Sequence, residues 1–370
     1  MHYIWQHIET IINSYDGTVP LVHFLKGYYR QYPKLGSRDR KMLSEMAYSW
    51  YRCSKALDET LPLKEKMATC LRLCDTNNAR LLQLTEGLGI AHDVQLNQLF
   101  PYDLQLSPGI TKEAWLNSML TQPSLFIRIR KNKGKLLEIL EEQQVPYQLI
   151  TNSCLALPNG TPVDKWLPPF AYVVQDASSQ KTSEYFTATP YEKWWDACSG
   201  AGGKSLLLKD KEPLADLTVS DTRKSILNNL KERFRTYSHI MPTAYEVDVA
   251  NAAQLEDIMK DKRFDNIICD VPCTGSGTWA RTPEQMYFFD PATADEYAAR
   301  QKQIAVNAAQ YLQPGGKLYY ITCSVFSIEN EEVVQHLTAQ TGMTVKEMEV
   351  INGIDIHADS MFIAVLEKTA

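Results

Sequence analysis

The sequence predicts an α/β protein in which a helical region and a small mixed region precede a doubly wound parallel sheet. From about residue 171, apolar runs typical of buried strands alternate with helical periodicities, which is the pattern of a parallel sheet covered on both faces. Residues 1–100 repeat apolar side chains at helical spacing, and residues 101–170 mix both patterns. We therefore expect three domains, comprising residues 1–100, 101–170 and 171–370.

The first region should contain several amphipathic helices. Residues 4–15 and 21–28 carry apolar side chains at helical spacing, and Ser37 is a good N-cap for a third helix. Residues 1–56 hold eight Lys and Arg against four Asp and Glu. This surplus is compatible with an RNA-facing surface, although solvated helix faces explain the composition slightly better.

The second region should combine a few strands with one helix. Residues 125–130 alternate as a strand, residues 135–143 read as a helix, and residues 147–150 look like a returning strand. The run from 128 to 135 holds five basic residues and no acidic one. Such a run is either a solvated surface or a phosphate contact, and we leave both interpretations open.

The third region supplies the parallel sheet. We expect its strands at 193–197, 217–220, 244–247, 264–269 and 317–321, with helices at 204–209, 223–237, 252–259 and 293–312. A helix at 327–339, whose first turn would hold Glu329, Glu331 and Glu332, should lead to final strands at 344–350 and 361–366.

Composition excludes several classes of protein. With 44% hydrophobic residues the 370-residue chain can bury large cores, and disorder is excluded. Residues 1–170 carry a net charge of +3 and residues 171–370 carry −9, so a polyanion would meet the first half more easily. Eight scattered cysteines fit a reducing compartment. The start of the chain lacks signal-peptide features and no apolar run reaches membrane-spanning length, so we expect a cytoplasmic monomer without membrane or metal.

A glycine-rich turn follows the first strand of the third region. It contains Gly203-Lys204-Ser205, but Cys198 stands where a phosphate-binding P-loop needs glycine or alanine. A nucleotide-type cofactor turn fits better, because Asp221 ends the next strand, 18 residues beyond Gly203, where it could hold ribose hydroxyls. Asp248 ends the third strand and is either a helix N-cap or an acceptor for an adenine amino group. The candidate cofactor-binding residues are Cys198, Ser199, Gly200, Ala201, Gly202, Gly203, Lys204, Asp221, Arg223, Asp248 and Asp270.

Two further strands end in a cysteine signature. Asp270-Val-Pro-Cys273 follows one strand, and Thr322-Cys323-Ser324 ends another. The carboxyl edge of an open α/β sheet is where ligands bind, so two thiols there indicate covalent catalysis. The alternative is a pair of buried packing cysteines, which is less compatible with the polar residues around both.

These motifs together resemble the RNA 5-methylcytosine methyltransferases of the Sun/Fmu (RsmB-like) family. The resemblance rests on Asp-Ala-Cys-Ser-Gly-Ala-Gly-Gly-Lys at 196–204, Asp-Val-Pro-Cys-Thr-Gly-Ser-Gly at 270–277, and Thr-Cys-Ser. Upstream, residues 37–52 resemble the NusB-like helical domain of the ribosomal small-subunit members. The sequence departs from the family pattern at Ala201, where proline is usual, and at Arg281-Thr282.

The resemblance implies a Rossmann-like domain that uses S-adenosyl-L-methionine, preceded by a NusB-like domain and a small α+β (RRM-like) subdomain. It further implies that Cys323 attacks the base, Cys273 assists breakdown of the adduct and Asp270 contacts the base. Apart from the resemblance, we name Lys204 as a candidate for activating the thiol, because the acidic residues after Cys323 would not do so. Its implied substrate is ribosomal RNA of the small subunit. Transfer RNA, or a non-catalytic role in ribosome assembly, is the alternative.

Overall fold

The computed structural model describes residues 2–369, which form two compact units. The helical unit contains the chain up to Leu104 together with Thr111–Pro123 and Thr278–Pro291. The sheet unit contains Gln105–Ile110, Ser124–Gly277 and the chain from Ala292 onward. The small mixed region and the parallel sheet thus lie in one unit.

The helical unit is built from amphipathic helices around one apolar core. Ile4, Ile8 and Ile11 of the first helix are almost fully buried, as their spacing predicts. The third helix begins at Ser37, but Gly36 occupies the N-cap position and no side chain caps this end, so the prediction of a Ser37 cap was wrong. The helices are α1 (His2–Ser14), α2 (Leu21–Gln31), α3 (Ser37–Cys53), α4 (Leu63–Leu73), α5 (Ala79–Thr85), α6 (Lys112–Met119) and α12 (Pro283–Tyr287).

A segment from the second half of the chain completes the helical unit. Thr278–Pro291, which we expected in the third domain, packs here because its polar groups are bonded to the first helices. The carboxylate of Glu284 accepts a hydrogen bond from the backbone nitrogen of Leu21 at 3.1 Å. The buried guanidinium of Arg52 donates to the carbonyl oxygens of Ala280 at 2.8 Å and Met119 at 2.7 Å.

The sheet unit is organised around a seven-stranded sheet with the order β10-β11-β9-β8-β5-β6-β7. Strands β9, β8, β5, β6 and β7 are parallel, and β11 runs antiparallel to both of its neighbours, β9 and β10. The predicted Rossmann-like class is therefore confirmed. The strands are β5 (Lys193–Asp196), β6 (Asp216–Asp221), β7 (Thr243–Glu246), β8 (Phe264–Asp270), β9 (Leu312–Thr322), β10 (Thr344–Ile351) and β11 (Met361–Glu367).

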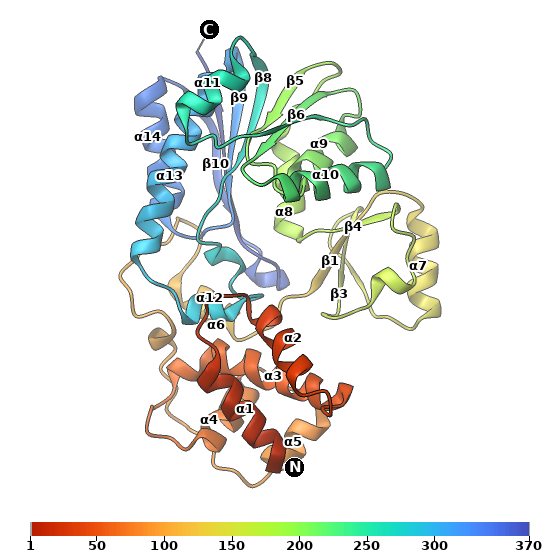
Figure 1. Ribbon diagram of the computed structural model, residues 1–370, viewed down its shortest axis with the longest axis vertical. Helices are drawn as coiled ribbons and strands as arrows, with labels where there is room; N and C mark the ends of the chain where they lie inside the picture. The colour runs from red at the N-terminus through yellow and green to blue at the C-terminus, as the bar shows by residue number, and fades with distance from the viewer. Residues whose placement is uncertain (1, 370) are drawn as a thin grey trace. The chain divides into compact units, whose positions relative to one another are not determined.

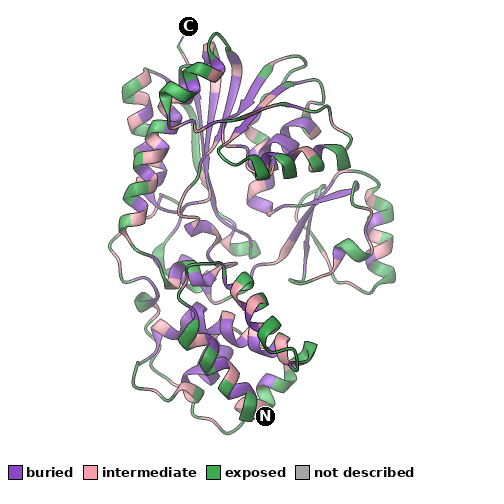
Figure 2. Ribbon diagram, in the orientation of Figure 1, coloured by how far each residue is buried: buried purple, intermediate pink, exposed green. Residues whose placement is uncertain are grey.

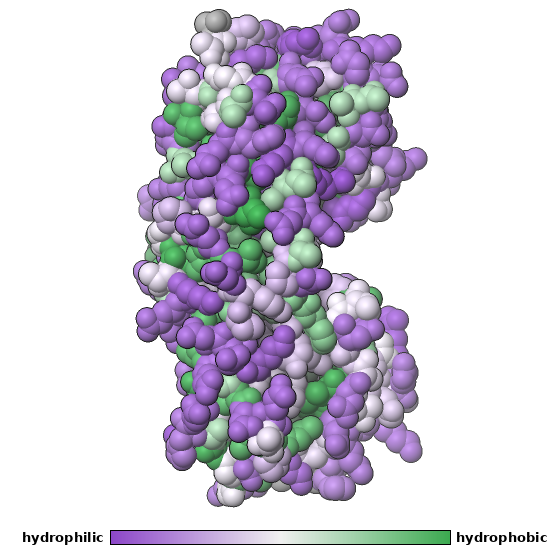
Figure 3. All heavy atoms as spheres, turned by 90° about the vertical axis from the view of Figure 1, so that its left-hand side faces the viewer, coloured by the Kyte–Doolittle hydropathy of each residue, from purple (hydrophilic) through white to green (hydrophobic). Residues whose placement is uncertain are grey.

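Helices cover both faces of this sheet (Figure 1). The helices α9 (Gly203–Lys211) and α10 (Lys224–Thr236) cover one face, and α11 (Ala252–Met259), α13 (Ala292–Ala309) and α14 (Glu331–Thr341) cover the other. Figure 2 shows the central strands buried, whereas α13 and α14 are buried on one side only. Figure 3 shows a mostly hydrophilic surface with scattered hydrophobic residues.

A second, four-stranded antiparallel sheet belongs to the same unit, with the order β2-β3-β1-β4. The predicted strand and helix correspond to β1 (Leu125–Ile129) and α7 (Lys133–Glu142), and the returning strand to β2 (Gln148–Leu149). We did not predict β3 (Cys154–Leu157) or β4 (Tyr172–Val174), since runs of three or four residues are too short to show a period. The short helix α8 (Ala177–Lys181) follows β4.

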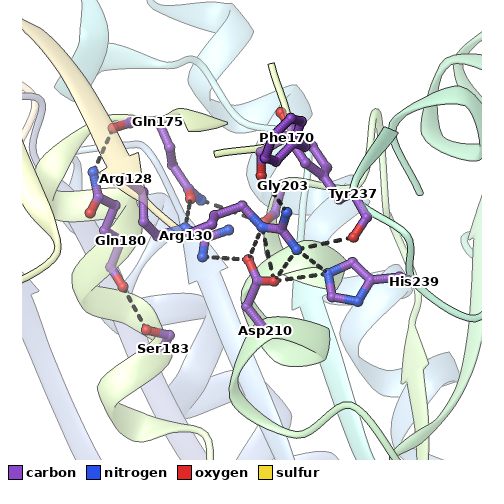
Figure 4. A network of polar contacts seen from close by, with 10 residues as sticks. All are labelled: Arg128, Arg130, Phe170, Gln175, Gln180, Ser183, Gly203, Asp210, Tyr237 and His239. Carbon is purple, nitrogen blue, oxygen red and sulfur yellow. Dashed lines mark hydrogen bonds and ion pairs between the residues drawn. The ribbon is translucent and has the colours of Figure 1, made fainter. Parts of the chain in front are cut away.

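An ion-pair network ties the small sheet to α9 (Figure 4). Arg128 and Arg130 on and beside β1 contact the carboxylate of Asp210 at 2.5 and 2.6 Å. Both arginine side chains are at least nine-tenths buried. Two of the five cations in the basic run are therefore internal and not available for a phosphate contact.

In the described range, no helix is long and apolar enough to cross a membrane. Within the same residues, no group of three His, Cys, Asp or Glu side chains could hold a metal ion.

Candidate functional site

A cavity of about 570 Å³ opens at the carboxyl ends of β5, β6, β7 and β8. The order of the sheet reverses between β5 and β8, and ligands bind at such a reversal in open α/β sheets. The cavity brings together eight of the predicted site residues: Cys198, Gly200, Asp221, Arg223, Asp248, Asp270, Cys273 and Cys323. Its other lining residues are Ala197, Thr222, Val247, Val249, Val271, Pro272, Arg300 and Ile304.

The glycine-rich turn shapes one wall of the cavity. Gly200 and Gly202 have positive φ angles of 49° and 82°, and a Cβ atom on Gly202 would lie 2.9 Å from Cγ of Leu230 on α10. The backbone nitrogen of Gly200 donates to Asp221 at 3.1 Å. The turn is thus held close to the end of β6, with room for a ligand above Gly200.

The other residues of the turn hold its shape and do not line the cavity. The hydroxyl of Ser199 donates to the carbonyl oxygen of Ser220 at 3.1 Å, and the carbonyl oxygen of Ala201 accepts from Arg233 at 2.6 Å. Gly203 begins α9, and its carbonyl oxygen accepts from the side chain of Gln175 at 3.4 Å.

Asp221 is largely buried at the end of β6, with a side chain 10% exposed. One oxygen accepts from Gly200, and the other accepts from the backbone nitrogen of Arg223 at 2.9 Å. The side chain of Arg223 is exposed and contacts the same carboxylate at 3.3 Å. Since each carboxylate oxygen has two lone pairs, Asp221 can still accept hydrogen bonds from a ligand.

Asp248 forms an ion pair with Arg300 of α13, with 2.9 Å between Oδ1 and Nη2. The same oxygen accepts from the backbone nitrogen of Ala250 at 3.0 Å. Asn251 caps α11 through a bond from the nitrogen of Gln254, so the interpretation of Asp248 as the helix cap was wrong. Nothing in the sequence pointed to Arg300, which lies 52 residues further along the chain.

The two strand-end thiols are neighbours, with 3.3 Å between the sulfur atoms of Cys273 and Cys323. The hydrogen bond to Cys323 and burial raise the pKa of the Cys273 thiol. Cys269 and Cys198 lie nearby, and burial raises the pKa of both thiols. The site therefore has one close thiol pair at the cavity wall and two further thiols whose ionisation is disfavoured.

Lys204 does not line the cavity and is held by three contacts of its own. Its ammonium group lies 3.4 Å from Asp270 and 2.8 Å from the hydroxyl of Ser179 on α8, with a side chain 5% exposed. It also lies 4.0 Å from the sulfur of Met361. In the described part of the chain these contacts go to Asp270, Ser179 and Met361, and none of them reaches either thiol.

The comparisons with known proteins agree with this geometry. Residues 185–366 match the family model described as 16S rRNA methyltransferase RsmB/F. Two relatives, both named Ribosomal RNA small subunit methyltransferase B, come from Shewanella oneidensis (30% identical over 168 residues) and Xylella fastidiosa Temecula1 (28% over 242 residues). The matches cover 45% and 63% of this chain and 38% and 55% of those relatives, so the chain spans about half the length of the curated relatives it matches.

Among solved structures, the one titled Crystal Structure of PH0851 has a TM-score of 0.71 over 94% of this chain and 95% of that chain. Its sequence identity is 16%, so the likeness establishes the fold alone. The predicted helical, small-sheet and Rossmann-like order is confirmed by it. The family match covers the cofactor turn and both cysteine motifs, and it confirms, for residues 185–366, the resemblance to the RsmB/F family that the motifs predicted.

Proposed function

We propose that this protein is an S-adenosyl-L-methionine-dependent RNA (cytosine-5) methyltransferase that acts on ribosomal RNA of the small subunit. The observation that carries the proposal is the pair of thiols 3.3 Å apart at the wall of a cofactor-sized cavity. The family match and the relatives named for the small subunit support the choice of substrate.

The residues around the cavity fit this cofactor. Asp221 would accept hydrogen bonds from ribose hydroxyls, and the backbone at Gly200 leaves room for the ligand because no atom lies within 4 Å of an added Cβ. Asp248, fixed by Arg300, would face the adenine end. When bound, S-adenosyl-L-methionine supplies an electrophilic methyl group.

Covalent catalysis explains the need for two thiols. C5 of cytosine is a poor nucleophile, and addition of a thiolate at C6 makes the ring electron-rich at C5. In this proposal Cys323 attacks C6, and C5 then takes the methyl group. A base removes the C5 proton, the bond between sulfur and C6 breaks, and Cys273 assists that release. Asp270, held by Lys204 at 3.4 Å, would contact the base.

The target base must be unpaired or flipped out, because C6 of a stacked cytosine is closed to the thiol. We place the reaction in the cytoplasm, where ribosomal RNA is available; the eight free thiols support this location.

Two measurements test the proposal. Bisulfite mapping of RNA from a deletion strain should show one cytosine of small-subunit RNA that loses its methyl group, and loss of a transfer RNA site instead would redirect the substrate. Purified protein should bind S-adenosyl-L-methionine. A protein that binds small-subunit RNA but not this cofactor would be an assembly factor and would refute the enzymatic role.

A further inference from the structure

The carboxylate of Glu329 lies between the two loops that carry the paired thiols. Glu329 ends the short helix η6 (Ser327–Glu329) and is 0% exposed. Its Oε1 atom accepts from the backbone nitrogen of Thr274 at 2.8 Å, and Oε2 accepts from the hydroxyl of Thr274 at 2.5 Å. Oε2 also accepts from the hydroxyl of Ser324. Thr274 and Ser324 directly follow Cys273 and Cys323, so one carboxylate bonds the neighbours of both thiols.

Other groups hold this carboxylate in place. The side-chain amide of Gln301 on α13 donates to Glu329 at 3.0 Å and to the carbonyl oxygen of Pro272 at 2.9 Å. The hydroxyl of Tyr320 donates to the carbonyl oxygen of Glu329 at 2.6 Å. Gln301 and Tyr320 are themselves fully buried. The bridge between the loops is therefore anchored to a strand and to a long helix.

This arrangement corrects the expected role of Glu329. We expected a helix N-terminus near Ser327, but α14 begins at Glu331, and Glu332 is the exposed carboxylate of that turn. A buried carboxylate is costly unless several donors compensate for lost hydration. Glu329 has four such donors from three segments of the chain. Since it is fully enclosed, it cannot touch a substrate and must act through its neighbours.

We propose that Glu329 is a positioning residue that fixes the distance between the thiols of Cys273 and Cys323. The inference rests on the function proposed above, in which both thiols act on the same base. Attack and release then require both sulfur atoms within reach of C6, and a misplacement of about 1 Å costs about a hundredfold in rate. The bridge keeps the sulfur atoms at 3.3 Å.

A cross-linking experiment tests the positioning without any substrate. Diamide removes two hydrogen atoms from a pair of adjacent thiols, which become a disulfide while diamide becomes a hydrazine. We expect the Cys273–Cys323 disulfide to form about tenfold more slowly in Glu329→Ala than in the wild type, since the loops lose their shared anchor. Peptide mass spectrometry measures the rate of disulfide formation. The thiols of Cys53 and Cys74, 3.9 Å apart in the helical unit, are the internal reference.

Three variants separate the geometry of the bridge from its charge and from the folding of the protein. Glu329→Gln keeps the length of the side chain; its oxygen can accept from the two N–H groups and its amide can donate to the two hydroxyls. We expect it to cross-link within about threefold of the wild type, because the bridge survives. Glu332→Gln removes an exposed carboxylate in the same region and should change nothing. Should Glu329→Ala fail to fold, Ser324→Ala removes one bond of the bridge and should slow cross-linking in the same direction.

Methylation kinetics complete the test. Glu329→Ala should lower kcat by about tenfold to a hundredfold, with the affinity for S-adenosyl-L-methionine unchanged, and Glu329→Gln should restore most of the rate. Equal cross-linking in the wild type and in a folded Glu329→Ala variant, or a wild type whose pair does not cross-link, overturns the positioning role. If cross-linking depends on Glu329 but the protein methylates no RNA, the proposed function is refuted and the positioning role of Glu329 is not.

Discussion

Replacing Asp210 by asparagine should strongly destabilise the sheet unit. The carboxylate of Asp210 contacts Arg128 at 2.5 Å, Arg130 at 2.6 Å and His239 at 2.8 Å, and its side chain is 18% exposed (Figure 4). Nε2 of His239 also lies 3.0 Å from Nη2 of Arg130. Since one nitrogen cannot both donate and accept, we assign its proton to the bond with Asp210, the stronger acceptor.

The size of the expected loss in stability follows from the two arginine charges that the substitution leaves unpaired. The side chains of Arg128 and Arg130 are 9% and 4% exposed, so Asp210→Asn leaves two guanidinium groups without a counter-charge in a nearly dry site. Removing one partner of a buried ion pair costs about 3–5 kcal/mol, and we take about 3 kcal/mol because Asp210 retains some contact with water. At about 2–4 °C per kcal/mol for domains of this size, the melting temperature should fall by about 6–12 °C.

The loss should also depend on pH in a definite direction. The contacts with His239, Arg130 and Arg128 outweigh burial and lower the pKa of Asp210. A carboxyl whose folded-state pKa is lowered contributes stability above its unfolded pKa of about 3.9, and that contribution is lost as the pH falls towards the folded value. The difference between wild type and Asp210→Asn should therefore be constant from neutral pH down to about pH 4 and shrink below it.

Denaturant unfolding at several pH values measures this difference, with Glu138→Gln as the matched control. Glu138 pairs with Lys135 on α7 at 3.3 Å, but both side chains are more than 60% exposed. An exposed pair of this kind contributes at most about 1 kcal/mol. If Asp210→Asn costs no more than Glu138→Gln, or if its cost grows below pH 4, the network is not a stabilising ion pair.

Three further predictions concern the cavity and its surroundings. Cys323→Ala should abolish methylation, whereas Cys273→Ala should leave a covalent protein–RNA adduct that is visible by denaturing gel electrophoresis; an active Cys323→Ala together with an adduct-free, inactive Cys273→Ala would reverse the two roles. Asp221→Ala should weaken S-adenosyl-L-methionine binding in a calorimetric titration before it affects RNA binding, and unchanged affinity would remove Asp221 from the site. Burial raises the pKa of Asp196 to about 7, so the wild type should lose stability as pH rises from about 4 through 7. Asp196→Asn cannot ionise, and denaturant unfolding at pH 5 and pH 9 should show a smaller loss of stability for this variant than for the wild type.

The strands and their end residues could be predicted because the signals are local. One continuous stretch of sequence holds both the apolar run of the strand and the Asp-x-Pro-Cys motif that follows it. Asp270 and Cys273 could therefore be placed at the sheet edge without knowledge of the other strands. The parallel topology then brings Cys323 to the same edge, 50 residues away, since every parallel strand ends there.

Residues that act through distant partners could not be predicted in this way. Glu329 resembles any acidic residue at a helix start, and its donors Thr274 and Gln301 lie 55 and 28 residues away in the sequence. Arg300 stands in an ordinary helical pattern and reaches Asp248 only because α13 crosses that edge of the sheet. No local pattern specifies such pairings.

Burial of basic side chains changes the interpretation of the charge surplus in the first half of the chain. Residues 1–170 contain 19 basic and 16 acidic side chains, a surplus that we took to favour a polyanion partner. Burial removes four of these basic side chains from contact with solvent: Arg52, Lys66, Arg128 and Arg130. None of the acidic residues in this half is buried, so 15 accessible basic groups face 16 acidic ones. This half of the chain therefore has no excess of accessible basic groups for contacts with RNA phosphates. Any phosphate contacts must come from local groups such as the exposed Lys131, whose removal should lower the salt dependence of RNA binding by about one counterion.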